Sequence, residues 1–342
     1  MNLDEAPFHG DPLADALADA VRADPALRAE LAKALDAGSR GAPSPVREFV
    51  ADLERVADAA DPDLLRAGAR ATFTTPQAVH VFDVGAGALI SSYRPPGPAT
   101  ILVGTGRLVG SAHLRLTDTA RWLTAASLPG GLVRGAPGWR MTAHVRLGHA
   151  LVRRAVRQDG PHTPISQFDS LRTWLDFTVV APRSAHRLGF GTTDAEYAQF
   201  LDHWRVLGEL LGVHPDLLAP VVDRPSAVAL LAEVDARTGP PNEDSRTLTA
   251  AGLDALATGL ADLTPVPQRV GLVAARAVAR RLQGEQADAL GVPRAGGWER
   301  VVPVVAAAAA AHRALLRRRP AAWERMVERN VAANRAFLAQ TG

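Results

Sequence analysis

Apolar residues recur every three or four positions along most of the chain, the spacing that places them on one face of an α-helix. Strand-like alternation is scarce, and alanine, leucine and arginine, all good helix formers, dominate. Several apolar runs begin with a proline or just after Ser, Asp or Thr, as helices do. The pattern predicts helices at residues 12–23, 25–37, 45–59, 76–84, 111–126, 140–157, 166–188, 194–211, 226–238, 246–263, 266–283, 298–318 and 321–340.

Gly- and Pro-rich breaks separate these helices, and none of the breaks is long enough to link independent domains. They fall at residues 38–45, 93–98, 129–138, 159–164 and 238–241. No repeat of fixed period is found. We therefore predict an all-α fold, with a helical domain over residues 61–342 and an N-terminal helical extension, residues 1–60, packed on it.

Composition removes several classes of chemistry. The 342 residues include no cysteine, which excludes cysteine nucleophiles, disulfides, iron–sulfur clusters and thiolate-ligated haem. Lys33 is the only lysine, which argues against a Schiff-base enzyme or a P-loop ATPase. The 38 basic and 36 acidic side chains are interspersed, so no nucleic-acid partner is expected.

The ends of the chain carry no targeting or spanning signal. The N-terminus, MNLDEAPFHGDPL, is acidic and lacks the apolar segment of a signal peptide. The charge-free apolar run at residues 301–311 is too short to span a bilayer. We expect a cytoplasmic protein without a membrane span, and both a monomer and a homodimer remain open.

A glycine-rich segment at residues 100–112, TILVGTGRLVGSA, has part of a dinucleotide-binding pattern. The third glycine, Gly110, comes one residue late after Gly104 and Gly106, and no alternating strands and helices surround the segment. The glycines instead favour a turn or helix that approaches a flat group closely.

His149 is the most informative of the ten histidines, which form none of the metal-ligand spacings H-E-x-x-H, H-x-H or E-x-x-H. It shares a helical stripe with Val145, Val152 and Val156, and we predict that this stripe faces inward. It also follows Gly148, whose missing side chain would let a planar group approach closely.

A second stripe beside it carries Arg146, Ala150, Arg153 and Arg157. A neutral imidazole in an apolar slot with guanidinium groups nearby suits haem b, because the histidine can bind the iron and an arginine can bind a propionate. The alternative is a hydrogen-bonded core histidine on a helix with a charged shoulder.

A second group of candidates lies on the helix LRLTDTARWL, where Arg115 and Thr119 are one turn apart and Asp118 lies between them. An arginine, a hydroxyl and a carboxylate within one turn could bind an oxygen species and move its protons. We expect Arg115 and Thr119 to share a face, and Asp118 to lie at its edge and pair with Arg115. The alternative is an ordinary helix start, capped by Thr117 and carrying an exposed ion pair.

These segments resemble the latex clearing protein (rubber oxygenase) family, whose catalytic domain is shared with endoplasmic-reticulum-bound oxygenases such as that of the mycophenolic acid pathway. RLTDTARWL is similar to the family's Arg-x-x-x-Thr helix and HVRLGHALVRR to its haem helix, and the interval from Thr119 to His149 also matches. The resemblance runs in scattered blocks from Gly10 to the C-terminus, through GDPLADAL, PISQFDSLRTWLDFTVV, HWRVLGELLGV and ADALGVP.

The resemblance implies a mostly helical, globin-like fold with one haem b, ligated by His149, and with Arg115 and Thr119 in the pocket. It also implies cleavage of isoprenoid carbon–carbon double bonds with O₂. Two departures matter. Rubber-cleaving members carry a lysine just before the motif threonine, where this chain has Asp118, and an upstream acid, whereas no Asp or Glu lies here between Asp83 and Asp118.

We therefore predict a haem b-dependent oxygenase that acts with O₂ on a small hydrophobic substrate, an isoprenoid or another alkene, and not on a polymer. A non-enzymatic haem or small-molecule binding protein and a peroxidase-type oxidation remain as alternatives. Because Asp118 cannot ligate iron as an amine does, we expect the sixth iron position to be open or bound by water. A second protein ligand would point to His113 or His144.

Overall fold

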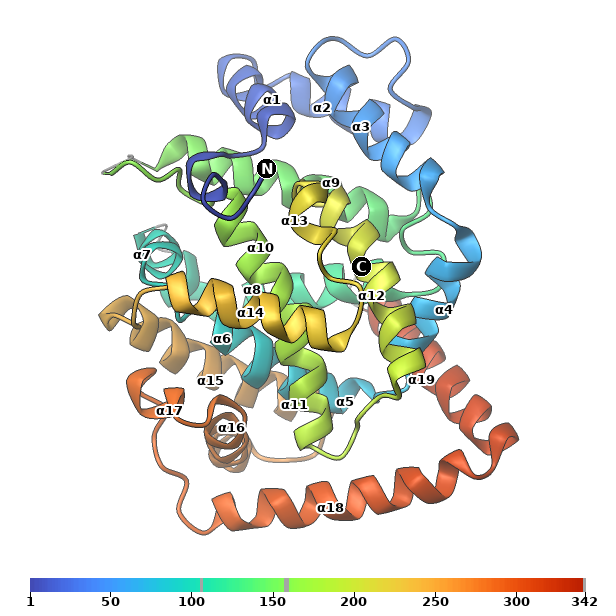
Figure 1. The fold of residues 1–342 in the computed structure, drawn as a ribbon, viewed down its shortest axis with the longest axis vertical. Coiled ribbons are helices and arrows are strands. Elements are labelled where there is room, and N and C mark those ends of the chain that lie inside the picture. The colour runs from blue at the N-terminus through green and yellow to red at the C-terminus, as the bar shows by residue number, and fades with distance from the viewer. Residues whose placement is uncertain (105–106, 157–159, 341–342) are drawn as a thin grey trace. The chain divides into compact units, whose positions relative to one another are not determined.

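The computed structural model describes residues 1–104, 107–156 and 160–340 of the chain. The all-α prediction is confirmed, since no strand occurs within these ranges and helices make up most of them (Figure 1). The chain forms two compact units, each assembled from separate segments. Unit 1 comprises Met1–Ala69, Trp122–Leu171 and Ala198–Val222, and unit 2 comprises Arg70–Arg121, Arg172–Tyr197 and Asp223–Gly342.

Unit 1 is built around the N-terminal helices and α9, and it contains η1 (Ala6–Phe8), α1 (Pro12–Ala23), α2 (Leu27–Ala37), α3 (Val46–Ala59), α9 (Pro137–Ala155) and α13 (Pro215–Leu218). Further helices have residues in both units, and these are α4 (Pro62–Thr72), α8 (Arg107–Ser127), α10 (Gln167–Leu175) and α12 (Asp194–Leu210). Helix α1 packs on α9 and α3, and α2 packs on α3. Helices α1 to α3 belong to unit 1 together with residues 122–171 and 198–222. The expected division into an N-terminal extension, residues 1–60, and a helical domain, residues 61–342, stays a prediction.

Unit 2 contains the remaining helices, which are α5 (Gln77–His80), η2 (Val81–Leu89), α6 (Ile90–Ser92), α7 (Pro96–Gly104), η3 (Asp176–Val180), α11 (Ala181–Arg187), α14 (Arg224–Arg237), α15 (Glu243–Leu263), α16 (Gln268–Gln283), α17 (Gln286–Ala289), α18 (Trp298–Arg317) and α19 (Pro320–Gln340). Both η2 and η3 are wide π-helical segments, a form that occurs frequently at functional sites. Within the described ranges, no helix is both long and apolar enough to cross a membrane.

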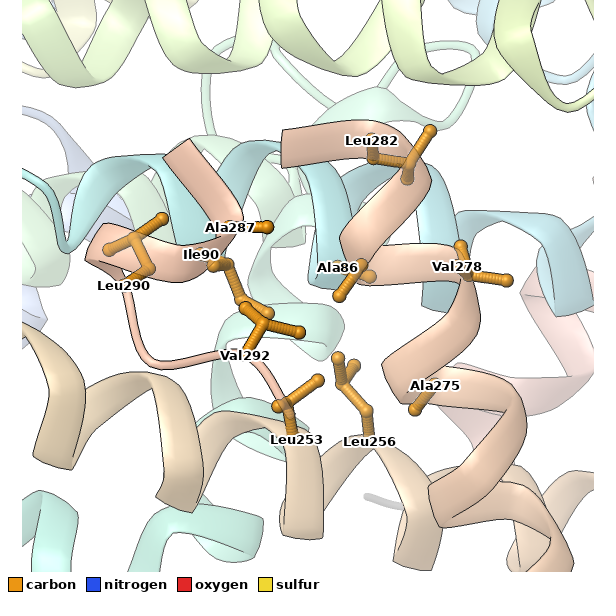
Figure 2. Close-up of a cluster of buried hydrophobic side chains, with 11 residues drawn as sticks. Ala86, Ile90, Leu253, Leu256, Ala275, Val278, Leu282, Ala287, Leu290 and Val292 are labelled. Atoms are coloured by element: carbon orange, nitrogen blue, oxygen red, sulfur yellow. The ribbon is translucent and has the colours of Figure 1, made fainter. Parts of the chain in front are cut away.

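An apolar cluster of unit 2 joins η2 and α6 to α15 and α16 (Figure 2). Ile90 points toward Val292 and Leu253, and Ala86 lies near Leu256. The helices approach closely because η2 carries glycines where they meet. A methyl group at Gly85 would overlap the end of the Leu256 side chain, so that side chain would have to shift to admit it.

Unit 2 also buries a charged group beside η3. Arg172 is almost fully buried, and its Nη1 lies 2.5 Å from Oδ1 of the buried Asp176, while its Nε lies 3.0 Å from Oδ1 of Asp235 on α14. Arg94 pairs with the other oxygen of Asp235 at 3.0 Å. Burial raises the pKa of Asp176 and the charge of Arg172 opposes the rise. Through Arg172, these ion pairs connect Asp176 on η3 to Asp235 on α14.

Unit 1 contains a buried histidine that connects three helices. His203 on α12 places Nδ1 3.3 Å from the carbonyl oxygen of Leu65 on α4 and Nε2 3.1 Å from that of Ala126 on α8. Burial lowers the pKa of His203 from its ordinary value of 6.5 to about 4, although both carbonyls favour the charged form. The ring is therefore neutral in the folded protein at neutral pH.

This histidine predicts a pH-dependent stability. Because its pKa is lower in the folded than in the unfolded chain, its contribution is complete above pH 6.5 and is lost as the pH falls toward 4. The free energy of unfolding should lose up to about 1.4 kcal/mol per pH unit there from this one group. Urea unfolding at several pH values in that range gives the free energy of unfolding as a function of pH. That free energy should change less steeply with pH for His203→Gln than for the wild type. Equal slopes would show that His203 does not titrate in this way.

Candidate functional site

Helix α9 carries His149, and its buried face differs from the predicted one. The buried side chains are Trp139, Thr142, Ala143, Arg146, Leu147, Ala150 and Arg153. In the stripe expected to face inward, Val145 and Val152 are half-buried and His149 is exposed. The inward prediction for this stripe is therefore wrong. The stripe with the arginines is buried instead, because carboxylates of unit 1 neutralise their charge.

Arg146 is fully engaged by two acids of the N-terminal segment. Its Nε and Nη2 donate to Asp11 at 2.6 and 3.0 Å, and its Nη1 donates to Asp52 at 2.8 Å. Its guanidinium also lies over the ring of Phe49, 5.2 Å from the centroid. Burial disfavours the charge, but the hydrogen bonds to Asp11 and Asp52 outweigh it and raise the pKa of Arg146. Every nitrogen of the guanidinium thus has an acceptor within unit 1.

Arg153, about two helical turns after Arg146 on the same face of α9, is held in a similar way. Its Nε donates to Asp15 at 2.8 Å and its Nη1 donates to the carbonyl oxygen of Ile165 at 2.6 Å. Both arginines fasten α9 to other segments of unit 1, and their expected role in binding a cofactor stays a prediction. The last member of their stripe, Arg157, lies outside the described residues.

The surface around His149 suits a planar ligand. A Cβ atom built on Gly148 would meet no atom within 4 Å, so α9 has open space at the residue before the exposed His149. The half-buried Val145 and Val152 lie on the same side of α9 as His149 and contribute apolar surface. Imidazole nitrogen is a common protein ligand of haem iron, so His149 would hold the group here. The residues of this face therefore fit a haem.

His144 lies on a different side of the same helix. Its side chain reaches solvent, but neighbouring atoms partly desolvate the ring, and this desolvation together with the charge of Arg28 on α2 lowers its pKa. Five residues separate it from His149, which turns the two side chains about 140° apart at about 3.6 residues per turn. His144 therefore cannot share a ligand with His149. Among the described residues, no three His, Asp or Glu side chains gather as metal ligands.

The second group of candidates lies on the part of α8 that belongs to unit 2. Arg115 and Thr119 are half-buried and Asp118 is exposed. The Thr119 hydroxyl donates to the carbonyl oxygen of Arg115 at 2.9 Å, the usual bond of a helical threonine. The expected ion pair between Arg115 and Asp118 does not form in the described part of the chain. His113, two residues before Arg115, lies 3.5 Å from a carboxylate oxygen of Asp262.

Tyr93 is a candidate that the sequence analysis missed. It is buried with Ala99 and Leu248, and Ala112 on α8 packs against this cluster. Because Ala112, Arg115 and Thr119 lie on one helical face, that face is turned toward the cluster. Burial raises the pKa of Tyr93, and the positive charge of Arg115 offsets part of the rise. The sequence offered little to indicate this residue as a site candidate. Tyr93 is one of two tyrosines in the chain, and it stands at the start of the Pro-rich break at residues 93–98.

The candidates thus fall into two groups that belong to different units. His149 and Gly148 lie in unit 1 with the two buried arginines, whereas Arg115, Asp118 and Thr119 lie in unit 2. Of the glycine-rich segment, Gly106 lies outside the described residues, and Gly104 ends α7. The first group can ligate a metal-bearing planar cofactor, and the second offers donors for a polar oxygen species.

Comparison with known proteins identifies the family. Residues 77–318 match the model of the catalytic domain shared by the ER-bound oxygenase mpaB/B' and rubber oxygenase. The chain belongs to this family. The rubber oxygenase match spans α9 and the unit 2 part of α8, and so contains both groups of candidate residues. Asp11, Asp15 and Asp52, which bind the buried arginines, precede it.

A solved structure shares the fold of this rubber oxygenase family member. The structure of latex clearing protein in its closed state is 23% identical in sequence, with a TM-score of 0.67. The match covers 98% of this chain and 91% of that chain. No curated protein matches the chain in sequence. The family resemblance inferred from sequence motifs is confirmed, and the chain carries an oxygenase-type catalytic domain.

Proposed function

We propose that the protein is a haem b-dependent oxygenase that uses O₂ to oxidise a small hydrophobic substrate. The substrate class is an isoprenoid or another alkene, and the reaction is oxidative cleavage of its double bond or a related oxidation. The observation that carries the proposal is the exposed imidazole of His149, with open space at Gly148, inside the segment that matches the oxygenase family.

On this proposal, His149 holds the cofactor through one neutral imidazole nitrogen. Haem, when bound, supplies the iron that binds and activates O₂. Gly148 lets the planar ring approach α9, and Val145 and Val152 present apolar surface to it. Arg146 would act indirectly. By fixing α9 to other segments of unit 1, it would hold the imidazole of His149 in place.

The residues of unit 2 would handle the polar part of the chemistry. Arg115 is a permanent cation and can hold an anionic oxygen species by charge-assisted hydrogen bonds. Thr119 can turn its hydroxyl from the Arg115 carbonyl toward a ligand and donate or accept a hydrogen bond there. Tyr93 keeps its proton because burial raises its pKa, so it serves as a donor and not as a base. Asp118 is exposed to solvent.

The two departures from rubber-cleaving relatives favour a small substrate. Asp118 stands where those relatives carry a lysine, and residues 84–117 contain no acid that could act as their upstream base. A chain without either group lacks that route to polymer cleavage. We therefore expect a low-molecular-weight alkene to be the better substrate in a direct comparison with a polymer.

A product assay tests the proposed reaction. The haem-loaded protein is incubated with short isoprenoid alkenes under ¹⁸O₂, and we expect labelled carbonyl products that His149→Ala does not form. Unchanged alkenes across a broad panel would instead support the binding protein. Oxidation that requires added hydrogen peroxide would support the peroxidase-type alternative.

The resting iron offers a separate test of Asp118. We expect the wild-type ferric protein to be high spin, with water or no ligand in the sixth position, and to become low spin with added imidazole. Asp118→Lys should convert a large fraction to low spin without any added ligand, because an amine then stands where the relatives have one. The ferric absorption and electron paramagnetic resonance spectra report both changes.

Asp118→Asn is the matched control, because it removes the same charge without adding an amine. It should keep the high-spin spectrum of the wild type. A fully low-spin wild-type spectrum in ligand-free buffer would mean that a second protein ligand exists, and the proposed role of α8 would then be wrong.

A further inference from the structure

A group of charged side chains in unit 2 carries more positive than negative charge. Beside the ion pairs that join η3 to α14, helix α11 adds two arginines, and α11 follows η3 directly in the chain. Arg183 is close enough to the other members for their charges to change its pKa. We call this group the arginine cluster, and it consists of Arg94, Arg172, Arg183, Arg187, Asp176 and Asp235. Four cations and two carboxylates leave it a net charge of +2.

Both aspartates of the arginine cluster are already engaged. The two carboxylate oxygens of Asp235 lie 3.0 Å from Nε of Arg172 and 3.0 Å from Nη1 of Arg94. Asp176 is completely buried, and its Oδ1 lies 2.5 Å from Nη1 of Arg172. Arg172 is itself almost fully buried, and its Nη2 donates to the hydroxyl of Ser91 at 3.4 Å. The two carboxylates therefore neutralise Arg172 and Arg94, and neither is left for the arginines of α11.

Arg183 is the cation of the cluster that has no carboxylate of its own. In the part of the chain that the structure describes, it forms no hydrogen bond or ion pair. Its side chain reaches solvent, but neighbouring atoms partly desolvate the guanidinium. This desolvation lowers the pKa of Arg183, and the positive charges of Arg187 and Arg94 lower it further, against the two aspartates. A partly desolvated cation beside other cations costs stability, and a bound anion would remove that cost.

Two neighbouring guanidinium groups are held in place beside Arg183. Nε of Arg94 is buried and has no hydrogen-bond acceptor among the described residues. Arg187 is one turn after Arg183 on α11, and its Nη1 donates to the carbonyl oxygen of Leu282 at 2.8 Å. Arg281 donates to the carbonyl oxygen of Arg187 at 3.2 Å and brings another positive charge to this end of α11. The cluster thus offers a buried donor and several cations to one ligand.

The charge and the donors of the cluster match a phosphate group. A guanidinium presents its N–H donors in a planar fork that pairs with two phosphate oxygens at once. A phosphate ester carries a charge of about −1.5 to −2 at pH 7, which balances the net charge of the cluster. A carboxylate carries a single charge and would balance only half of it. A phosphate group is therefore the better ligand for the arginine cluster.

We propose that the arginine cluster of unit 2 binds one phosphate group through Arg183, Arg187 and Arg94. Arg172 and its two aspartates form the fixed base of this site, because they are buried and paired with one another. The group is a free phosphate or the end of a small organic phosphate ester, since the arginines meet the same oxygens in both. This site is additional to the proposed haem site and does not depend on it.

Isothermal titration calorimetry of the full chain with sodium phosphate, in a phosphate-free buffer of low ionic strength, tests the site. We expect one phosphate per chain to bind at millimolar concentration or below. Arg183→Gln should weaken binding at least about tenfold, because it removes the cation that no carboxylate neutralises. Arg329→Gln is the matched control, because it removes the same charge from an exposed position on α19, and it should bind as the wild type does. Circular dichroism should show both variants folded, because both side chains reach solvent.

Phenyl phosphate in the same titration distinguishes the two sources of the group. Tighter binding of phenyl phosphate than of inorganic phosphate would assign the site to an organic ester, and weaker binding would assign it to the free ion. Both results support a phosphate site. The ligand that binds should also raise the Tm of the wild type by mass action and leave that of Arg183→Gln nearly unchanged.

The absence of heat and of any rise in Tm with both ligands at millimolar concentration would overturn the proposal. An Arg183→Gln variant that binds like the wild type would overturn it as well. So would an equal response to sodium chloride at the same ionic strength, because that would show general screening of surface charge. These measurements need neither haem nor O₂, so their outcome is independent of the proposed oxygenase reaction.

Discussion

His149→Ala should purify without haem. The exposed imidazole is the proposed axial ligand, and the chain contains no cysteine that could replace it. Hydrophobic contacts with Val145 and Val152 alone do not hold the iron, so the Soret absorption per protein should fall to a small fraction of the wild-type value. Absorption spectroscopy and iron analysis of protein expressed with an added haem precursor measure this directly.

Two further variants distinguish loss of the iron ligand from misfolding as the cause of haem loss. His149→Gly leaves a space that free imidazole can enter, so added imidazole should restore a Soret band in that variant. His144→Ala removes a histidine from another side of the same helix and should keep its haem. A wild-type protein with neither Soret absorption nor iron would contradict the haem proposal, and a His149→Ala variant with normal haem would reassign the ligand.

The hydrophobic spacing was sufficient to predict most helices of the fold. The helix predicted at residues 12–23 is α1 (Pro12–Ala23), and that predicted at 194–211 is α12 (Asp194–Leu210). Agreement is close because these helices are amphipathic and begin at a proline or just after a polar capping residue. In α1 the cap is Asp11, whose carboxylate accepts from the backbone N–H of Ala14 at 3.2 Å.

The pattern failed where helices are short, glycine-rich or wide. Helix α7 (Pro96–Gly104) lies partly in a segment interpreted as a break and partly in one left open between a turn and a helix, because its prolines and glycines are typical of loops. The predicted helix at 166–188 is interrupted by η3, whose Asp176 is buried against Arg172. Spacing rules assume about 3.6 residues per turn and cannot anticipate a π segment that an ion pair stabilises.

The candidate site was only partly predictable, for a related reason. The residue types at Arg115, Thr119 and His149 resemble a family, and that family is confirmed. The buried face of α9 was wrongly predicted because the valine and histidine stripe was taken as the inward one and the arginine stripe as lying beside it. Asp11 and Asp52 are distant from Arg146 in sequence, and no local pattern shows that they neutralise it.

Arg146→Ala should destabilise the protein by about 3–5 kcal/mol, the cost of removing one partner from a buried ion pair. The variant leaves the carboxylate of Asp11 buried with no cation, and it also loses the contact over Phe49. Against a typical total stability of about 5–15 kcal/mol, this loss is large. Urea unfolding gives the difference, and Arg154→Ala, which removes an exposed pair with Asp19, should cost no more than about 1 kcal/mol.

The effect of Arg146→Ala should be present without haem and should fade in acid. A propionate ligand would matter only in the loaded protein, whereas a bond between α9 and Asp11 acts in the apoprotein as well. Burial pushes the pKa of Asp52 upward, but Arg146 outweighs this and keeps that pKa below its ordinary value. The Asp52 contribution is therefore complete above about pH 4 and is lost as the pH falls further. The difference in the free energy of unfolding between wild type and Arg146→Ala should narrow below that pH. A difference found only in the haem-loaded protein would indicate that Arg146 binds the cofactor.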